Sequence, residues 1–269
     1  MGHEAPQPQN TPAMAFERLL SILNTLRAEC PWDRKQTFES LRHLTIEEMY
    51  ELTDALLEND YDEIKKELGD VMMHLVFYAK IADEQQQFTI TDVLNAVCDK
   101  LINRHPHIYG DTTVNSDDDV KNNWEAIKLK EGNSSVLSGV PKGLPALIKA
   151  YRVQDKVRGV GFDWKDKRQV WQKVEEELAE FKAEFSVEEP AAIDKSRAEE
   201  EFGDLLFSLI NYARHLGINP ENALERTNKK FIRRFMHIEK RAAENGLQLK
   251  EMTLEQMDVY WNEAKNLPG

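Results

Sequence analysis

The stretch Glu200-Glu201-Phe202-Gly203-Asp204-Leu205-Leu206-Phe207 decides the fold, because its polar and apolar residues have helical spacing. Glu201 and Asp204 are three residues apart, so on a helix both carboxylates leave the same face. Asn211 continues this polar stripe, and apolar residues fill the other positions, which predicts a largely buried helix. Buried carboxylates repel one another unless a cation or a shared proton relieves them. Gly203 costs a helix about 1 kcal/mol relative to Ala and predicts the close approach of another backbone.

A second acidic stretch, residues 175–180, repeats this spacing with Glu177 and Glu180. If the two helices pack with their acidic stripes facing, the carboxylates of Glu177, Glu180, Glu201 and Asp204 converge. Oxygen ligands without His or Cys favour hard divalent cations, with Mg²⁺ first and Mn²⁺ second. Mg²⁺ held by a few carboxylates usually completes its shell with substrate phosphates. The pattern therefore predicts metal-dependent chemistry on a phosphorylated small molecule.

Composition favours an all-α protein and excludes several functions. The 269 residues contain 41% hydrophobic residues but only 12 Gly and 10 Pro, which is typical of helical domains. A net charge of −13 argues against a nucleic-acid or anionic-membrane partner. Cys30 and Cys98 are too few for a disulfide framework, which favours a cytoplasmic location, and no apolar run is long enough to span a membrane. Residues 1–13 are polar and Pro-rich, and we expect a disordered lead-in.

The motifs occur twice in the same order. Glu177 and Glu180 follow Glu48 and Glu51 by 129 residues, Glu201 and Asp204 follow Glu67 and Asp70 by 134, Lys230 and Arg234 follow Lys100 and Arg104 by 130, and Trp261 and Lys265 follow Trp124 and Lys128 by 137. Such a repeat predicts two homologous domains, residues 14–130 and 144–266, joined by a linker at 131–143. In the first, we expect helices over about 14–28, 37–59, 62–84 and 90–103 from the apolar periodicity.

Each motif alone has an ordinary explanation. Acidic pairs are common on solvated helix faces, and Lys230 with Arg234 could form surface salt bridges. Beside carboxylates and a metal, the same cations would neutralise phosphate oxygens. Signatures of P-loop, dinucleotide-binding and serine-hydrolase sites are absent from the sequence, as is the Glu-x-x-His pair of di-iron bundles.

The tandem motifs resemble those of the MazG family of nucleoside triphosphate pyrophosphohydrolases. The resemblance covers residues 14–266 and rests on EExxE, ExGD about 20 residues later, Lys-x3-Arg and Trp-x3-Lys. It implies an all-α, four-helix-bundle-like fold in each half, a homodimer, and Mg²⁺-dependent cleavage of nucleoside triphosphates to a nucleoside monophosphate and pyrophosphate.

The resemblance also implies roles for individual residues. The metal ligands would be Glu177, Glu180, Glu201 and Asp204, and the nucleotide contacts would be Lys173, Lys230, Arg234, Trp261 and Lys265. Mg²⁺ would polarise the α-phosphoryl group and activate a water molecule. Either Glu177 or Glu201 could accept the proton of that water.

We expect the two halves to differ. Alignment through the constant offsets places Lys173 opposite Leu44, Asn211 opposite Phe77, and Asn228 opposite Cys98. Each exchange removes a polar group from the first half, so we predict that the second half holds the principal active site, with Asn211 and Asn228 in substrate binding. The matching first-half residues form a second candidate site: Glu48, Glu51, Glu67, Asp70, Lys100, Arg104, Trp124 and Lys128.

Two alternatives stay open. The acidic stripes would be partner-binding surfaces if the chain is a non-catalytic helical interaction or metal-sensing module, and in that case the Glu201 face would lie in water away from the Glu177 helix. A narrower, dUTPase-like nucleotide hydrolase would have a similar carboxylate site but accept few nucleotides.

Overall fold

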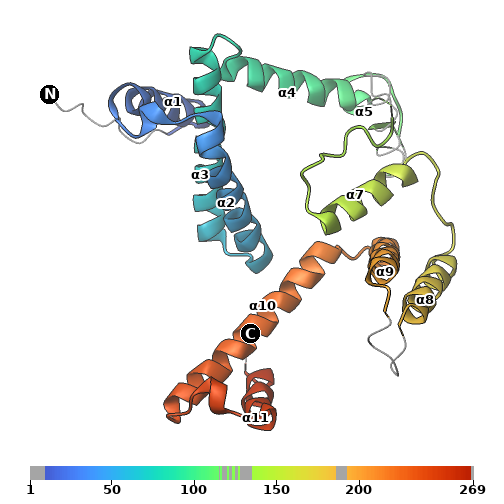
Figure 1. The fold of residues 1–269 in the computed structure, drawn as a ribbon. Helices are drawn as coiled ribbons and strands as arrows, with labels where there is room; N and C mark the ends of the chain where they lie inside the picture. Colours follow the sequence, from blue (N-terminus) through green and yellow to red (C-terminus); the bar gives the residue numbers. More distant parts are fainter. Residues whose placement is uncertain are drawn as a thin grey trace. The chain divides into compact units, whose positions relative to one another are not determined.

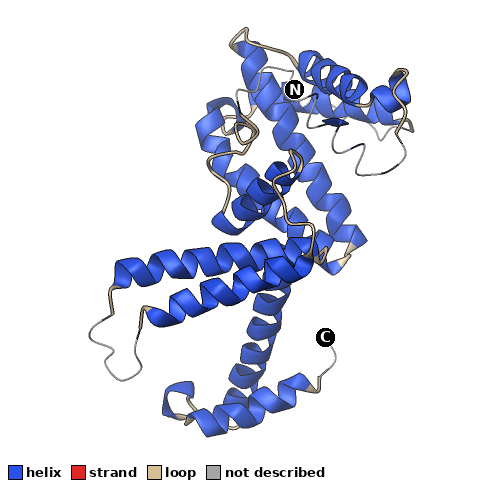
Figure 2. Cartoon of the chain, turned by 90° about the vertical axis from the view of Figure 1, so that its right-hand side faces the viewer, coloured by secondary structure: helices blue, strands red, loops and turns tan. Residues whose placement is uncertain are grey.

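The structure, a computed structural model, describes residues 10–114, 116, 120, 123, 124, 127, 135–185 and 193–267. Over these ranges it contains helices and no strand, which confirms the predicted all-α class (Figures 1 and 2). The chain divides into two compact units, Met1–Thr113 and Val114–Gly269. The linker predicted at 131–143 falls in the second unit and is described only from Ser135 onwards.

The first unit contains the helices that the apolar periodicity predicts. They are α1 (Pro12–Glu29), α2 (Phe38–Glu58), α3 (Tyr61–Glu84), α4 (Ile90–Arg104) and the short α5 (Pro106–Tyr109). Side chains of Thr11, Thr37, Asp60 and Thr89 cap the first four by accepting hydrogen bonds from backbone N–H groups of the first turn. Pro106 begins α5 directly after α4 has ended, as expected of a residue that cannot continue a helix.

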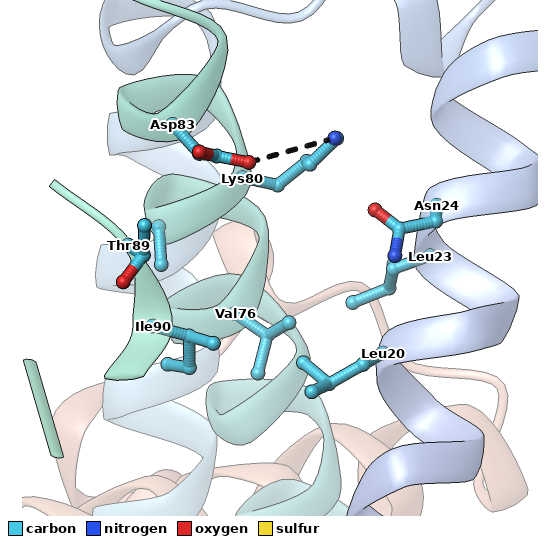
Figure 3. A pocket seen from close by; sticks show the side chains of 9 residues that line it. Leu20, Leu23, Asn24, Val76, Lys80, Asp83, Thr89 and Ile90 are labelled. Atoms are coloured by element: carbon cyan, nitrogen blue, oxygen red, sulfur yellow. Dashed lines mark ion pairs between the residues drawn. The ribbon is translucent and has the colours of Figure 1, made fainter. Parts of the chain in front are cut away.

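The core of the first unit lies between α1, α2 and α3. Its buried residues are Leu23, Leu41, Val76, Phe77 and Ile81. Beside it, a small cavity of about 110 Å³ is lined by α1, the second half of α3 and the start of α4 (Figure 3). The walls are mostly apolar, with an ion pair between Lys80 and Asp83 at 3.9 Å. This end of the unit is therefore hydrophobic packing and does not contain the acidic stripe.

The second unit contains the matching set of helices. They are α7 (Ala146–Arg158), α8 (Lys167–Ala183), α9 (Lys195–His215), α10 (Pro220–Glu244) and α11 (Leu254–Lys265). Helices α8 and α9 pack side by side, α10 packs on α11, and α7 packs on α9 (Figure 1). Val170, Val174, Leu205 and Ile210 are buried in the α8–α9 pair. None of the helices in the described ranges combines the length and apolar character needed to cross a bilayer.

Gly203 does not have the role that we predicted for it. A Cβ atom at this position would meet no atom within 4 Å, so no second backbone approaches it among the described residues. Gly203 instead opens onto an apolar groove of about 560 Å³. The groove is lined by Ala146, Leu147 and Ala150 of α7, Gly203, Leu206, Phe207, Leu209 and Ile210 of α9, and Pro220 and Leu224 of α10.

Candidate active site

In the second half, the packing of α8 against α9 brings three of the four predicted metal ligands together. Glu177, Glu180 and Glu201 each offer a carboxylate oxygen, and these oxygens lie within 4.8 Å of one another. Glu177 is only 6% exposed, Glu201 is partly buried and Glu180 is exposed. Asp204 lies one turn after Glu201 on α9, is exposed, and is not part of this group of three.

The electrostatics of this group favour a cation. Partial desolvation and the neighbouring carboxylates of Glu177 and Glu201 raise the pKa of Glu180 above its ordinary value. The ammonium of Lys173 lies 2.7 Å from Glu176 and 2.6 Å from Glu177, and these hydrogen bonds raise the pKa of Lys173. One lysine therefore offsets part of the negative charge of the group.

The first half builds a similar group from α2 and α3, in which Asp70, the counterpart of Asp204, takes part and the counterpart of Glu180 does not. Oxygens of Glu48, Glu67 and Asp70 lie within 4.8 Å of one another. Glu67 is 2% exposed, and its Oε2 is buried with no hydrogen-bond partner, while Oε1 accepts a 2.8 Å hydrogen bond from Lys66. Desolvation and the charges of Asp70, Glu51 and Glu67 raise the pKa of Glu48. Glu51 itself is exposed and outside the group of three.

Three first-half residues that we did not predict extend this polar face. His74 follows Asp70 by four residues on α3 and is buried. Its Nδ1 lies 2.8 Å from the hydroxyl of Thr45, which lies 2.6 Å from the hydroxyl of Tyr78. Desolvation lowers the pKa of His74, although the charge of Asp70 opposes the shift. The i, i+4 spacing from Asp70 to His74 is a sequence signal that could have identified this residue.

Five of the seven predicted nucleotide-binding residues of the second half lie on α10 and α11. The guanidinium of Arg234 lies 5.4 Å from the ring centre of Trp261, which packs on Phe231 at 5.2 Å. Lys230 and Lys265 are exposed, and Asn228 donates a 3.1 Å hydrogen bond to Glu225. Between residues 195 and 267, no ion pair or hydrogen bond joins these α10 and α11 side chains to the carboxylate of Glu201.

The first-half counterparts are described in part. Lys100 is exposed on α4, and Arg104 and Trp124 are half-buried. Lys128 lies outside the described residues. The structure thus assembles the first-half carboxylates.

Asn211 is buried at the far end of the second-half acidic stripe. Its Oδ1 accepts hydrogen bonds from Nε and Nη2 of Arg214 at 3.1 and 2.8 Å. Arg214 also donates to Oδ1 of Asp163 at 2.6 Å, and Nε2 of His215 lies 2.9 Å from the same oxygen. Sequence reasoning missed Arg214 and His215, because a basic pair at the end of a helix is ordinarily explained by the helix dipole.

The donor set fits a hard divalent cation. Both groups of three are formed by carboxylates alone, which are the ligands that Mg²⁺ and Mn²⁺ prefer. Carboxylates that are gathered without a cation have raised pKa values and oxygens that lack a partner. The raised pKa of Glu180 and the buried, unpartnered Oε2 of Glu67 are both of this kind. Neither group contains a His or Cys ligand that would favour zinc or iron.

Comparison with known proteins identifies the family of the chain. The MazG nucleotide pyrophosphohydrolase domain matches residues 36–109, which include the first-half carboxylates. The chain is 45% identical over 255 residues to the nucleoside triphosphate pyrophosphohydrolase/pyrophosphatase MazG of Thermotoga maritima, covering 93% of this chain and 95% of that protein. It is 41% identical over 257 residues to the nucleoside triphosphate pyrophosphohydrolase of Escherichia coli K12, covering 93% and 97%.

A third relative covers part of the chain. The nucleoside triphosphate pyrophosphohydrolase of Mycolicibacterium smegmatis is 36% identical over 163 residues, which are 58% of this chain and 49% of that protein. Since the first two similarities extend over nearly the full length of both partners, they include both acidic groups and not one motif alone. The chain belongs to the MazG family of nucleoside triphosphate pyrophosphohydrolases.

Proposed function

We propose that this protein is a Mg²⁺-dependent enzyme that hydrolyses nucleoside triphosphates to nucleoside monophosphate and pyrophosphate. The observation that supports this most directly is the convergence of Glu177, Glu180 and Glu201 from two packed helices, with Lys173 beside them. The near full-length similarity to proteins named nucleoside triphosphate pyrophosphohydrolase supports the same reaction.

Glu177, Glu180 and Glu201 would hold the cation, and Asp204, exposed one helical turn after Glu201, would add a fourth carboxylate. Mg²⁺, or Mn²⁺ in its place, would supply Lewis-acid polarisation of the α-phosphoryl group and activation of the attacking water. The buried carboxylate of Glu177 or that of Glu201 would accept the proton from the water. The ammonium of Lys173, released from Glu177, would reach a phosphate oxygen.

The remaining contacts with the nucleotide come from α9, α10 and α11. Lys230, Arg234 and Lys265 would offset the charge of the phosphates, so that pyrophosphate leaves as a stabilised group. The ring of Trp261, already covered on one side by Arg234, would stack on the base in a manner that tolerates different bases. Asn211 and Asn228 would add hydrogen bonds to the nucleoside.

The reaction is tested by product analysis. We expect ion chromatography of the purified protein with Mg²⁺ and a nucleoside triphosphate to show monophosphate and pyrophosphate in equal amounts, and no reaction with excess EDTA. Nucleoside diphosphate and orthophosphate as products would contradict the proposed bond cleavage. Unchanged activity in EDTA would contradict the metal requirement.

One structural observation and one experiment separate the alternatives. A non-catalytic module would leave the Glu201 face in water away from α8, whereas the carboxylates of Glu201 and Glu177 converge. A dUTPase-like enzyme of narrow specificity is distinguished by a nucleotide panel assayed for pyrophosphate. We propose broad use of nucleoside triphosphates, because stacking on Trp261 does not depend on the identity of the base.

We also propose that the second half, residues 144–266, is the principal active domain and that the first half, residues 14–130, has residual or regulatory function. The first-half carboxylates are assembled, but Phe77 replaces Asn211 and lies in the core. Arg27 places its guanidinium 5.7 Å from the centre of the Phe77 ring, which closes the end of the stripe where Asn211 lies in the second half. Apolar bulk there leaves no hydrogen-bonding group for a nucleoside.

We propose that the protein is a homodimer. The apolar groove of about 560 Å³ along α7, α9 and α10 leaves Leu206, Phe207 and Leu209 exposed. In the first unit, α4 exposes Val93, Leu94 and Val97 on one face. Apolar patches of this extent are typical of surfaces that are covered in an assembly.

A further inference from the structure

Four polar side chains form one connected network at the end of the second-half acidic stripe. Asn211 and Arg214 belong to α9, and Asp163 lies in the loop between α7 and α8. Arg214 donates to both partners, to Asn211 at 2.8 Å and to Asp163 at 2.6 Å, and the exposed fraction of its side chain is 8%. The network therefore ties the loop to the helix through a nearly buried guanidinium.

The hydrogen bonds fix which atom of the Asn211 amide is available. Because a guanidinium only donates, the atom that Arg214 contacts at 2.8 and 3.1 Å must be the amide oxygen. The NH₂ group then faces away from Arg214. Within residues 135–185 and 193–267, no hydrogen bond engages that NH₂ group, and it is not among the fully buried polar atoms that lack a partner, so it is a donor without a protein acceptor that keeps some exposure.

Asn211 lies on the same helix as Glu201, further along α9 from the carboxylate group. It follows Glu201 by ten residues on the same face of α9, which places it about 15 Å along the helix axis. If the carboxylates hold the phosphates through a metal, the nucleoside end of the substrate would extend in this direction or the opposite one. In the described length of α9, Asn211 offers this stripe a hydrogen-bond donor without a protein acceptor, whereas the hydroxyl of Ser208 donates to the carbonyl of Leu205.

Asp163 and His215 hold the guanidinium in place. Burial alone would raise the pKa of Asp163. The pKa nevertheless lies below its ordinary value, because Arg214 and His215 donate hydrogen bonds to the carboxylate and bring positive charge near it. Nε2 of His215 lies 2.9 Å from Asp163 and 3.0 Å from Nη2 of Arg214. This ring nitrogen can donate to the carboxylate or accept from the guanidinium, so in either tautomer it restrains a member of the pair.

The first half lacks three of the four side chains of this network. At the matching positions it has Phe77 for Asn211, Lys80 for Arg214 and Ile81 for His215. Lys80 pairs with Asp83 instead, and both Phe77 and Ile81 belong to the hydrophobic core. The network is therefore a feature of the half to which we assign the activity.

We propose that Asp163, Arg214 and His215 are positioning residues that lock the Asn211 amide with its NH₂ group toward the substrate, where it donates a hydrogen bond to an oxygen or ring nitrogen of the nucleoside. The inference rests on the proposed function, because it assumes that a nucleotide binds along this stripe. It adds a specific role for three residues that do not themselves touch substrate.

A double-mutant cycle tests this role. The variants are Asn211→Ala, Arg214→Lys and the double variant, with circular dichroism to check folding. The measurement is the dissociation constant of an α,β-methylene nucleoside triphosphate with Mg²⁺, a probe that binds without being cleaved. We expect Asn211→Ala to weaken binding about 10-fold, Arg214→Lys by about 3- to 10-fold, and the double variant by no more than Asn211→Ala alone.

Additive losses of affinity would overturn the proposal, because they would show that Arg214 acts without Asn211. An Arg214→Lys variant with wild-type affinity would also overturn it. Arg168→Lys is the matched control, since Arg168 forms a 2.6 Å pair with Asp166 near the same loop but is exposed. If Arg214→Lys fails to fold, Asp163→Asn in the same cycle replaces it. Product analysis of the wild-type protein is run beside the cycle, so that failure of the proposed reaction is seen separately from failure of the positioning role.

Discussion

The ammonium of Lys173 lies 2.6 Å from the carboxylate of Glu177, one turn further along α8. In the first half, the ammonium of Lys66 lies 2.8 Å from the carboxylate of Glu67, which is also buried, although Lys66 belongs to α3 and is the residue directly before Glu67. Each acidic group thus keeps one lysine against its most buried glutamate. Leu44 aligns with Lys173, but the first-half group still has a cation beside it, because Lys66 lies against Glu67.

Lys173→Met tests the importance of this contact in the second half. We expect turnover to fall at least about 10-fold, because the variant loses a cation for the phosphates, and we expect a lower melting temperature without metal, because Glu177 is left buried and unpaired. Steady-state kinetics and thermal unfolding measure the two effects. Lys182→Met, an exposed change on the same helix, is the control. Full activity of Lys173→Met would exclude a phosphate contact.

Glu180→Gln tests the cation site without an activity assay. The folded-state pKa of Glu180 is raised above its ordinary value of 4.5, so the stability that this group contributes is complete below that pH and is lost as the pH rises through the folded pKa. At neutral pH we therefore expect the metal-free variant to be more stable than the wild type. We also expect Mg²⁺ to raise the wild-type melting temperature and to raise that of the variant much less. Equal shifts would argue against a metal ligand at Glu180.

The sequence was sufficient for the helices, because they depend on local periodicity, and the repeated acidic spacing was sufficient to predict that two acidic helices pair. The caps at Thr37 and Thr89 and the stop before Pro106 are local signals of the same kind. Burial along the stripe was harder to predict. Glu201 joins the group of three while Asp204, on the same face, stays exposed, because the contact depends on where α8 crosses α9.

The Asn211 network could not be predicted from local patterns. Asp163 and Arg214 are separated by 51 residues and meet only because the loop after α7 folds back onto α9. The role predicted for Gly203 was wrong for a related reason, since the space beside a helix depends on its neighbours and here it is an open groove.

Asp163→Asn tests how much the charge of Asp163 contributes to the stability of the protein. Since the folded-state pKa of Asp163 is below its ordinary value of 3.8, its stabilising contribution is present above that pH and is lost as the pH falls through the folded pKa. We expect the variant to melt at a lower temperature near neutral pH and the difference from wild type to shrink in acid. Thermal unfolding between about pH 3 and pH 7 measures this. A constant difference across the range would show that the charge of Asp163 is unimportant.

Leu206→Glu tests the proposed dimer. This residue is exposed in the apolar groove beside Gly203, and we expect a buried charge there to disfavour association. Light scattering of the wild type should give about twice the 31.2 kDa of one chain, and the variant should approach one chain. Leu254→Glu, an exposed apolar position outside the groove, is the control. A wild-type mass near 31.2 kDa at micromolar concentration would contradict the assembly.

The most direct test of the account compares Glu201→Gln with Glu67→Gln in the same assay. Both changes keep the size of the side chain, both remove one carboxylate from a group of three, and circular dichroism verifies the fold of each. The measurement is the rate of pyrophosphate release from a nucleoside triphosphate with saturating Mg²⁺. The account predicts that Glu201→Gln lowers turnover by at least about 100-fold, the scale of losing a major electrostatic contributor, and that Glu67→Gln lowers it far less. Equal losses, or a larger loss for Glu67→Gln, would contradict the assignment of the principal active site to the second half.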